Sequence, residues 1–202
     1  MIFGCIIGER ALPLALRRTK MDNGACSYRR FLDGDEEAFD EIVKEYFDSL
    51  VFFINGYISD FQASEDIAID TLSDLIVNKK RYNFKVTLKT YLFMLAKSRA
   101  KNYIKHRNII KITALDDERE SYVNEVSIED SYLLDERKRA LYEALSTLPC
   151  DMRTVVYLIY FENMSYDEAA RVMKKSKKQI DNLLYRAKNQ LRTILTDNGE
   201  EI

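Results

Sequence analysis

The sequence predicts an all-α protein of two small helical domains joined by an acidic linker, the C-terminal domain being a helix-turn-helix. Glycine is scarce, with six in 202 residues, and none stands between Gly56 and Gly199. Because tight turns between strands usually need glycine at positive φ, this scarcity argues against a sheet. Apolar residues recur at helical spacing on both sides of residues 108–134, a segment that loses this spacing and exceeds ordinary loops in length.

Residues 1–25 are expected to be a disordered or dispensable tail. Their apolar residues precede Arg17 and Arg18, whereas a signal peptide carries its positive charge first. A helix that touches a membrane surface is the alternative interpretation. No apolar run in the chain approaches the roughly 18 residues of a membrane span, so stable membrane insertion is not expected.

Residues 26–107 are predicted to form the first domain. Apolar positions from Tyr28 to Ile54 follow helical spacing, with Asp35 as an N-cap and an end near Gly56. A second helix is expected to begin at Ser64, whose hydroxyl suits an N-cap. The residues that this helix should bury are Ile67, Leu72, Leu75 and Ile76. Its acidic residues, mostly expected on the outer side, are Glu65, Asp66, Asp70 and Asp74.

A third helix is expected from about residue 87 to residue 106. Its apolar face begins at Leu88 and includes Leu92 and Ala96. Side chains four residues apart lie on one side of a helix, so the lysines of this segment should form an exposed basic ridge. These lysines are Lys97, Lys101 and Lys105.

Residues 135–197 are predicted to form the second domain. One helix covers about residues 135–148, and Pro149 opens the next, where its missing N–H costs little. Ser165 and Glu168 have the spacing of a capping box, and Ser176 and Gln179 repeat it eleven residues later. Two short helices joined by a short turn indicate a helix-turn-helix.

The second helix of this motif has the composition of a DNA-recognition helix. Lysines near its start suit phosphates, and Asn and Arg further along suit base edges in the major groove. The candidate DNA-contacting residues are Lys177, Lys178, Gln179, Asp181, Asn182, Tyr185, Arg186 and Lys188. An ordinary antiparallel helical hairpin with a solvated basic face is the alternative.

Charge is sorted into alternating blocks. Residues 33–74 hold thirteen acids and one base, and residues 79–111 hold eleven bases and no acid. Residues 112–136 are again acidic, with nine acids and one base, and residues 165–195 carry eight bases and three acids. Basic helices attract phosphate backbones, whereas acidic helices suit a basic protein surface. The pattern indicates a protein that binds nucleic acid and a protein partner together.

The composition argues against an enzyme and against a metal site or cofactor. His106 is the single histidine, which excludes the common sites that need two. Cys5, Cys26 and Cys150 are far apart and form no C-x-x-C pair, as expected in a reducing cytoplasm. No nucleophile–base set or phosphate loop is present. No catalytic residue and no cofactor are therefore expected.

Four groups of residues stand in order along the chain: Phe31 to Phe39, Ser64 to Asp70, Thr90 to Tyr103, and Leu148 to Ala187. Together they resemble the sigma-70 family of bacterial transcription initiation factors, and more narrowly its two-domain extracytoplasmic-function (ECF) type. The stretch from Phe31 to Phe39 resembles the opening helix of that family, and Ser64-Glu65-Asp66-Ile67 with Asp70 resembles its polymerase-binding segment. Thr90-Tyr91-Leu92 and Lys101-Asn102-Tyr103 resemble the segment that reads the −10 element. Leu148-Pro149, Ser165 to Ala170 and Arg186-Ala187 resemble region 4. Residues 26–107 and 135–197 would then be region 2 and region 4.

The resemblance implies a protein that binds core RNA polymerase, through the β′ clamp helices and the β flap, and recognises −10 and −35 promoter elements. Its polymerase-binding residues would be Glu65, Asp66 and Asp70. Its −10 contacts would be Tyr91, Lys97, Ser98, Arg99, Lys101, Asn102, Lys105 and Arg107. The recognition helix would read the −35 element, and an anti-sigma factor is an expected partner. Departures from the family pattern stand at Ile69, Ser98 and Asp181.

Two other functions remain open on the sequence alone. A dimeric helix-turn-helix regulator would share the C-terminal half and bind an operator without being a polymerase subunit. A helical adaptor would use the charged faces to bind proteins only, but it leaves the two successive capping boxes without a purpose. Loss of association on nuclease treatment would separate the adaptor from the two DNA-binding functions.

Overall fold

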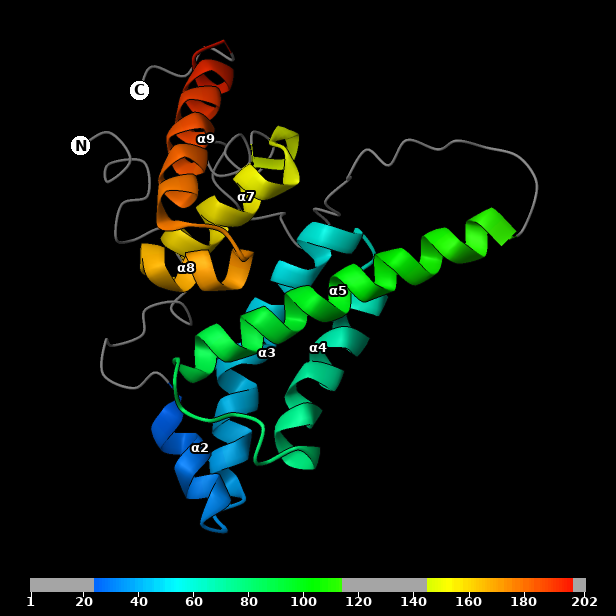
Figure 1. Cartoon of the computed structure of the whole chain (residues 1–202), viewed down its shortest axis with the longest axis vertical. Coiled ribbons are helices and arrows are strands. Elements are labelled where there is room, and N and C mark those ends of the chain that lie inside the picture. Colours follow the sequence, from blue (N-terminus) through cyan, green and yellow to red (C-terminus); the bar gives the residue numbers. More distant parts are fainter. Residues whose placement is uncertain (1–23, 114–144, 198–202) are drawn as a thin grey trace, which may run out of the picture.

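The structure, a computed structural model, describes residues 24–113 and 145–197, and every regular element in these ranges is helical (Figure 1). The predicted all-α class is confirmed. The first half contains α2 (Ala25–Leu32), α3 (Glu37–Ile58), α4 (Phe61–Val77) and α5 (Leu88–Thr113). The second half contains α7 (Cys150–Val156), the π-helical turn η2 (Tyr157–Phe161), α8 (Tyr166–Met173) and α9 (Lys177–Asp197).

Some sequence predictions lie outside the described residues. These are most of the tail at residues 1–25, most of the linker at 108–134, and the helix over 135–148 apart from its helical residues 145–147. Helix α5, which was expected to end at about residue 106, continues through Thr113 into the segment predicted as the linker.

The first helical segment is divided in two between α2 and α3. Gly34 adopts a φ of 103°, a value that side chains rarely tolerate, and it turns the chain between the helices. The N-cap position of α3 is Glu36, and the predicted cap Asp35 lies one residue before it. The Asp35 side chain still caps the first turn, since its Oδ1 accepts a hydrogen bond from the Ala38 N–H at 3.3 Å. Helix α3 passes through Gly56 and ends at Ile58, so the predicted end near Gly56 falls two residues short.

Helix α4 begins earlier than predicted. Its N-cap is Asp60, whose side chain accepts a hydrogen bond from the Ala63 N–H at 3.1 Å. Ser64 is completely buried one turn further on, and its hydroxyl donates to the Asp60 carbonyl at 2.7 Å. The prediction of Ser64 as the N-cap is therefore wrong. The packing of α4 places Ser64 inside the helix, where its hydroxyl bonds a carbonyl of the preceding turn and not a free N–H.

The core of the first half lies where α3, α4 and α5 meet. Leu50 and Ile54 of α3, Leu75 of α4 and Leu92 of α5 are buried there. Tyr28 of α2 is fully buried beside them, and its hydroxyl lies 3.1 Å from the Leu75 carbonyl and 2.9 Å from the Lys79 carbonyl. This buried phenol holds α2 against the end of α4.

The core of the second half lies between α7, α8 and α9. Its fully buried side chains include Val155, Leu158, Ile180 and Leu191. The predicted turn between α8 and α9 is present, with Lys174 in the left-handed conformation at a φ of 54°. The Lys175 N–H donates to the Ala170 carbonyl at 3.0 Å, which closes the end of α8 in a Schellman-type cap.

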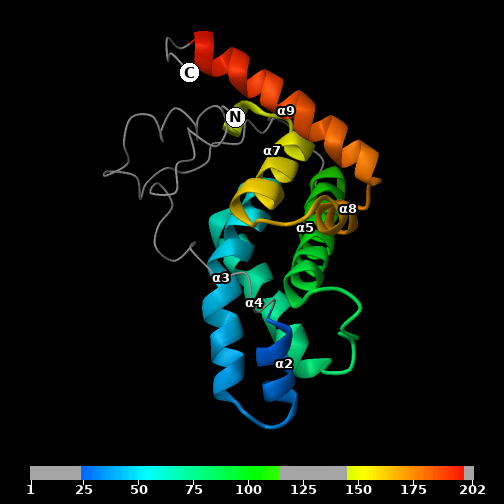
Figure 2. The same ribbon diagram turned by 90° about the vertical axis from the view of Figure 1, so that its left-hand side faces the viewer.

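The two halves pack against each other along two contacts, α5 with α8 and α3 with α7 (Figure 2). Phe53 of α3 contacts both halves. The centre of its ring lies 4.9 Å from that of Phe93 in α5 and 6.2 Å from that of Tyr157 in η2. Helix α5 is therefore covered on two sides. This explains why Phe93 and Ala100 are buried in addition to the apolar face that the spacing predicted.

We expect Lys174→Gly to stabilise the protein by about 0.5–1 kcal/mol, because a side chain in the left-handed region is strained and glycine is not. Chemical denaturation would measure the change. Gln190→Gly, at an exposed position within α9, is the matched control and should destabilise by about 0.5–1 kcal/mol. An equal loss of unfolding free energy in both variants would show that the Lys174 backbone is not strained.

Candidate nucleic-acid interface

Helix α9 presents the predicted recognition residues on an open face. Lys177, Lys178, Asp181, Asn182 and Arg186 are exposed, and Tyr185 is 67% exposed. The opposite face of the helix enters the core through Ile180, Leu184, Ala187 and Leu191. Amides, guanidinium and ammonium groups are therefore free to meet a DNA groove along one side.

Both capping boxes are present and orient this helix-turn-helix. The Ser165 hydroxyl accepts from the Glu168 N–H, and the Glu168 carboxylate accepts from the Ser165 N–H. In α9 the Ser176 hydroxyl accepts from the Gln179 N–H at 3.2 Å, while Gln179 Oε1 accepts from the Ser176 N–H at 2.8 Å. The side-chain oxygen of Gln179 therefore takes part in capping, and no hydrogen bond of the side-chain amino group is seen among the described residues.

Two further recognition residues have partners within the protein. Lys177 forms an exposed ion pair with Asp167 at 3.0 Å. Lys188 is half-buried, and its Nζ lies 5.4 Å from the centre of the Tyr160 ring. An exposed ion pair contributes little to stability, so Lys177 can exchange Asp167 for a phosphate at low cost.

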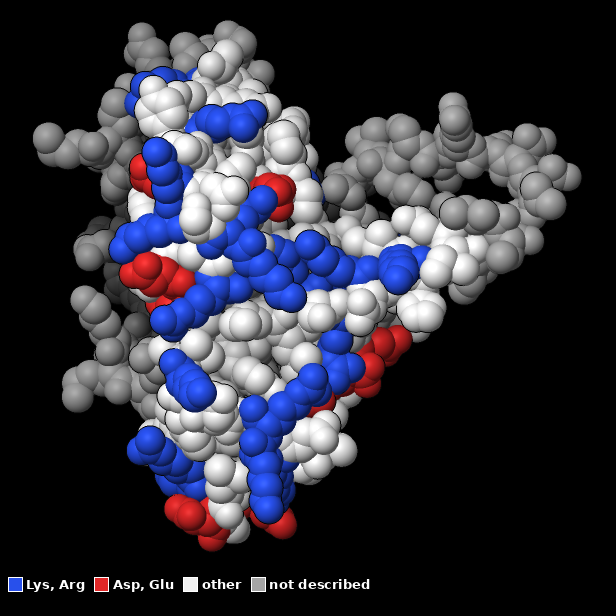
Figure 3. Space-filling view, viewed as in Figure 1, with Lys and Arg blue, Asp and Glu red and all other residues white. Residues whose placement is uncertain are grey.

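Helix α5 carries the second candidate surface. Ser98, Lys101, Asn102 and Lys105 are exposed along it, and Arg107 is half-buried. Figure 3 shows basic side chains running from the α8–α9 region across α5, so the two predicted basic segments form one continuous band on this face. The basic segments 79–111 and 165–195 are far apart in the sequence, and the packing of α5 on α8 brings them together.

The prediction for Lys97 as part of the exposed ridge is wrong. Lys97 is 5% exposed, and its Nζ donates a hydrogen bond to the Met173 carbonyl at the end of α8, at 3.1 Å. Burial lowers the pKa of Lys97 to about 8, and the nearby positive charges of Lys101 and Lys175 contribute to the shift. The neighbouring α8 covers this side of α5, and no helical spacing in the sequence reveals that contact.

Asp74 also departs from the prediction, which placed it mostly on the outer side of α4. It is 6% exposed, and its Oδ1 lies 3.2 Å from Arg81 Nη1 and 3.3 Å from Arg99 Nη2. The Tyr91 hydroxyl donates to Oδ2 at 3.4 Å. Asp74 thus holds two of the predicted −10 residues, Tyr91 and Arg99, at the junction of α4 and α5.

The segment between α4 and α5 holds a cluster of aromatic rings. Tyr82 is buried, its hydroxyl donates to the Val86 carbonyl, and its ring lies 4.7 Å from Phe84 and 5.1 Å from Tyr91. Phe84 has a φ of 58°, which is uncommon for a bulky residue. Arg29 of α2 lies 5.0 Å from the centre of its ring. Phe84 and Tyr91 are both half-buried, so each ring is partly exposed.

The outer face of α4 combines acids with exposed apolar residues. Asp66 and Asp70 are exposed, and Glu65 is half-buried. The same helix exposes four large hydrophobic side chains, with exposed fractions of 58%, 52%, 44% and 78%: Phe61, Ile69, Ile76 and Val77. Ile76 was predicted to be buried, and that prediction is wrong. A mixed acidic and apolar face suits a protein partner, and the apolar part is the signal that charge counting missed.

The chain is similar to several known proteins. Residues 138–191 match the family model described as sigma-70, region 4. The chain is 26% identical over 168 residues to the RNA polymerase sigma-H factor of Pseudomonas aeruginosa, covering 78% of this chain and 86% of that protein. It is 25% identical over 156 residues to the ECF RNA polymerase sigma factor SigM of Bacillus subtilis, covering 77% and 93%.

The fold is shared with a solved structure, that of the sigma factor RpoE in complex with the anti-sigma factor NepR from Bartonella quintana. The TM-score is 0.61 at 20% identity, over 79% of this chain and 98% of that one. Among the described residues, no helix is long and apolar enough to cross a membrane.

We expect the stability of the protein to rise with pH between about 8 and about 10.5, through Lys97. Its pKa is about 8 when folded against an ordinary value of 10.5, so the unfolded chain binds more protons in this window. The charges facing Lys97 are Lys101 on α5, Lys175 beyond α8 and Asp151 on α7, together with the Cys150 thiol. Thermal denaturation against pH measures the slope.

Lys97→Met is the comparison variant, because it keeps the length of the side chain and removes the titrating group. The difference in slope between the two proteins isolates Lys97 from the tyrosines that also titrate in this range. Equal slopes for both proteins would show that Lys97 keeps its ordinary pKa.

Proposed function

The chain belongs to the sigma-70 family, ECF type, and we propose on that premise that it binds core RNA polymerase and directs it to promoters with −10 and −35 elements. Its matched relatives are named RNA polymerase sigma factors. This favours a polymerase subunit over the alternative, a helix-turn-helix regulator that acts without polymerase.

The observation that carries the proposal is the presence of three exposed faces of different chemistry. Helix α9 offers amide and guanidinium groups on the open side of a helix-turn-helix, which suits the −35 element. Helix α5 offers Ser98, Lys101, Asn102 and Lys105, which suit the −10 element. Helix α4 offers acids beside exposed apolar residues, which suits a polymerase surface.

In this proposal the DNA-binding residues divide into phosphate and base contacts. Lys101, Lys105, Lys177 and Lys178 neutralise phosphates, and such contacts set affinity rather than sequence preference. Asn182 and Arg186 are placed to read base edges, because amide and guanidinium groups make paired hydrogen bonds to adenine and guanine. Phe84 supplies an aromatic face beside the −10 helix on which an unpaired base can stack.

The partners in this proposal are core polymerase, through its β′ clamp helices and β flap, promoter DNA and an anti-sigma factor. Two solved structures with the same fold are described as complexes, one with the anti-sigma factor NepR and one with the cytosolic domain of CnrY. The protein acts without catalysis of its own and works in the cytoplasm, where polymerase and promoters are.

We expect the double reversal Asp66→Lys and Asp70→Lys to abolish core polymerase binding, because like charges at an interface cost several kcal/mol. A pull-down with purified core enzyme measures it. Asp40→Lys, an exposed acid on α3, is the control and should bind normally. Normal holoenzyme assembly by the double variant, with its helical content unchanged, would remove these residues from the contact.

We expect Arg186→Ala to weaken binding to a −35 element by about 1–3 kcal/mol and to relax preference at one base pair. The measurement is holoenzyme binding to a set of promoters with single substitutions in that element. Arg192→Ala is the control, since Arg192 lies on the same helix and its side chain points about 120° away from that of Arg186 around the helix axis. If the two variants bind every promoter alike, Arg186 does not read a base.

A further inference from the structure

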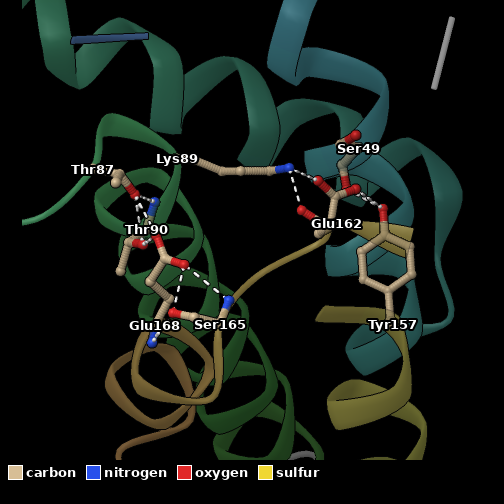
Figure 4. Close-up of polar contacts among 8 residues, drawn as sticks. All are labelled: Ser49, Thr87, Lys89, Thr90, Tyr157, Glu162, Ser165 and Glu168. Carbon is tan, nitrogen blue, oxygen red and sulfur yellow. Dashed lines mark hydrogen bonds and ion pairs between the residues drawn. The ribbon is translucent and has the colours of Figure 1, made fainter. Parts of the chain in front are cut away.

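An ion pair between half-buried Lys89 and the buried carboxylate of Glu162 joins the two halves of the protein at the start of α5. Lys89 Nζ lies 2.7 Å from the Glu162 carboxylate and donates a hydrogen bond to the Glu162 main-chain carbonyl, also at 2.7 Å (Figure 4). The Glu162 side chain is 3% exposed. The Tyr157 hydroxyl lies 2.9 Å from the same carboxylate and 3.1 Å from the Ser49 carbonyl of α3. In the closed arrangement, removing or reversing either partner would leave a charge without compensation at this site, so the arrangement depends on both residues.

A second carboxylate connects the N-termini of two helices. Thr87 is the cap of α5, since its Oγ1 accepts from the Thr90 N–H at 3.1 Å. The Thr87 and Thr90 hydroxyls both lie near Glu168 Oε1, at 3.1 and 3.3 Å, while Oε2 caps α8 through Ser165. Burial alone would raise the pKa of Glu168, but these hydrogen bonds outweigh it and the pKa is lowered. Glu168 is therefore held as an anion between the positive ends of α5 and α8.

Further polar contacts lie along the seam, the surface where α5 and α3 of the first half meet α8 and α7 of the second half. Lys97 donates to the Met173 carbonyl, as described above. On the α3 side, Arg153 Nη2 donates to the Gly56 carbonyl at 2.9 Å, and the Thr154 hydroxyl donates to the Tyr57 hydroxyl at 3.0 Å. The seam thus fixes one particular arrangement of the two halves.

This arrangement is too compact to engage both promoter elements. Elements centred at −10 and −35 lie about 25 base pairs apart, or about 85 Å along B-DNA. Lys97 contacts Met173, and α9 begins four residues later at Lys177. Chain geometry then limits the distance between the Cα atoms of Lys97 and Lys177 to about 26 Å. The two DNA-binding helices must therefore move apart before both elements are bound.

We propose that the compact structure is a closed form in which the free chain holds its −10 helix against its −35 half, and that Lys89, Glu162 and Glu168 form the latch. The proposal rests on the proposed function, because it takes α5 and α9 as the two promoter-binding helices. Binding of polymerase and promoter opens the latch and separates the halves.

Opening also changes what α5 offers to DNA. Lys97 leaves the Met173 carbonyl and joins Lys101 and Lys105 on the exposed ridge, so the helix gains a phosphate contact that the closed form conceals. The closed form brings the basic segments of both halves together, and their repulsion opposes the latch. A duplex that neutralises these charges along two separated sites favours the open form.

The test measures the separation of the halves in the free, full-length chain. Cysteines at Lys44 of α3 and Asn189 of α9, both exposed, carry spin labels in a chain whose own cysteines are serines. We expect one narrow distance distribution for the parent protein. Lys89→Glu and Glu162→Arg each place like charges at the latch, and each should raise the open population about tenfold or more. Lys101→Glu changes an exposed lysine of the same helix and should leave the distribution unchanged.

The charge swap separates a latch from general damage. Lys89→Glu combined with Glu162→Arg restores opposite charges and should restore the narrow distribution. Single variants that remain as closed as the parent, or a parent chain already as open as they are, would overturn the proposal. If the double variant regains the thermal stability of the parent but keeps a broad or long distance distribution, the Lys89–Glu162 pair does not hold the closed form.

Core polymerase and promoter DNA supply the second arm. We expect the parent distance to lengthen in the promoter complex, and Glu162→Arg to tighten apparent core binding by the factor that its open population rises. A short distance that persists in an active promoter complex overturns the closed form as an inhibited state. A chain that binds no polymerase overturns the proposed function instead, while the distances in the free chain still test the latch.

Discussion

Helix α5 is packed on both sides, and the arrangement of the other helices depends on this constraint. On one side it completes the core with α3 and α4, where Leu92 and Ala96 are buried. On the other side it contacts α8. Glu168 bonds to Thr87 at the start of α5, and Met173 bonds to Lys97 further along α5. One helix thus belongs to the core of the first half and to the seam with the second. The position of α9, which follows α8 after a short turn, is set by the same contact.

Polar groups, rather than apolar area alone, define how the halves meet. The Lys89–Glu162 pair, the Glu168 carboxylate and the Lys97 ammonium are all desolvated at or near the seam. Such groups give little net stability compared with apolar packing, but they penalise every arrangement in which they lack partners. A seam of this kind holds one geometry when closed and releases well-hydrated charged groups when open. That property suits a protein whose two DNA-binding halves must act at a distance from each other.

The local predictions that succeeded rest on interactions within a few residues. Asp35 caps α3, and both capping boxes form, because each needs only a backbone N–H three residues away. The open face of α9 also follows from its spacing of apolar residues. Two of the predictions that failed concern side chains whose partners are distant in sequence. Asp74 meets Arg99, and Lys97 meets Met173, at separations that no local pattern encodes.

The sequence by itself determined the helical class, the helix-turn-helix with its two caps, and the resemblance to the sigma-70 family. It did so because caps, helical periodicity and charge blocks act over short stretches of chain. Only the tertiary structure decided which acids of α4 are buried, which apolar residues of α4 are exposed, and that Lys97 is withdrawn from the basic ridge. These outcomes depend on which face of each helix meets another helix. That choice is made by packing among segments up to about a hundred residues apart, such as Arg153 on Gly56.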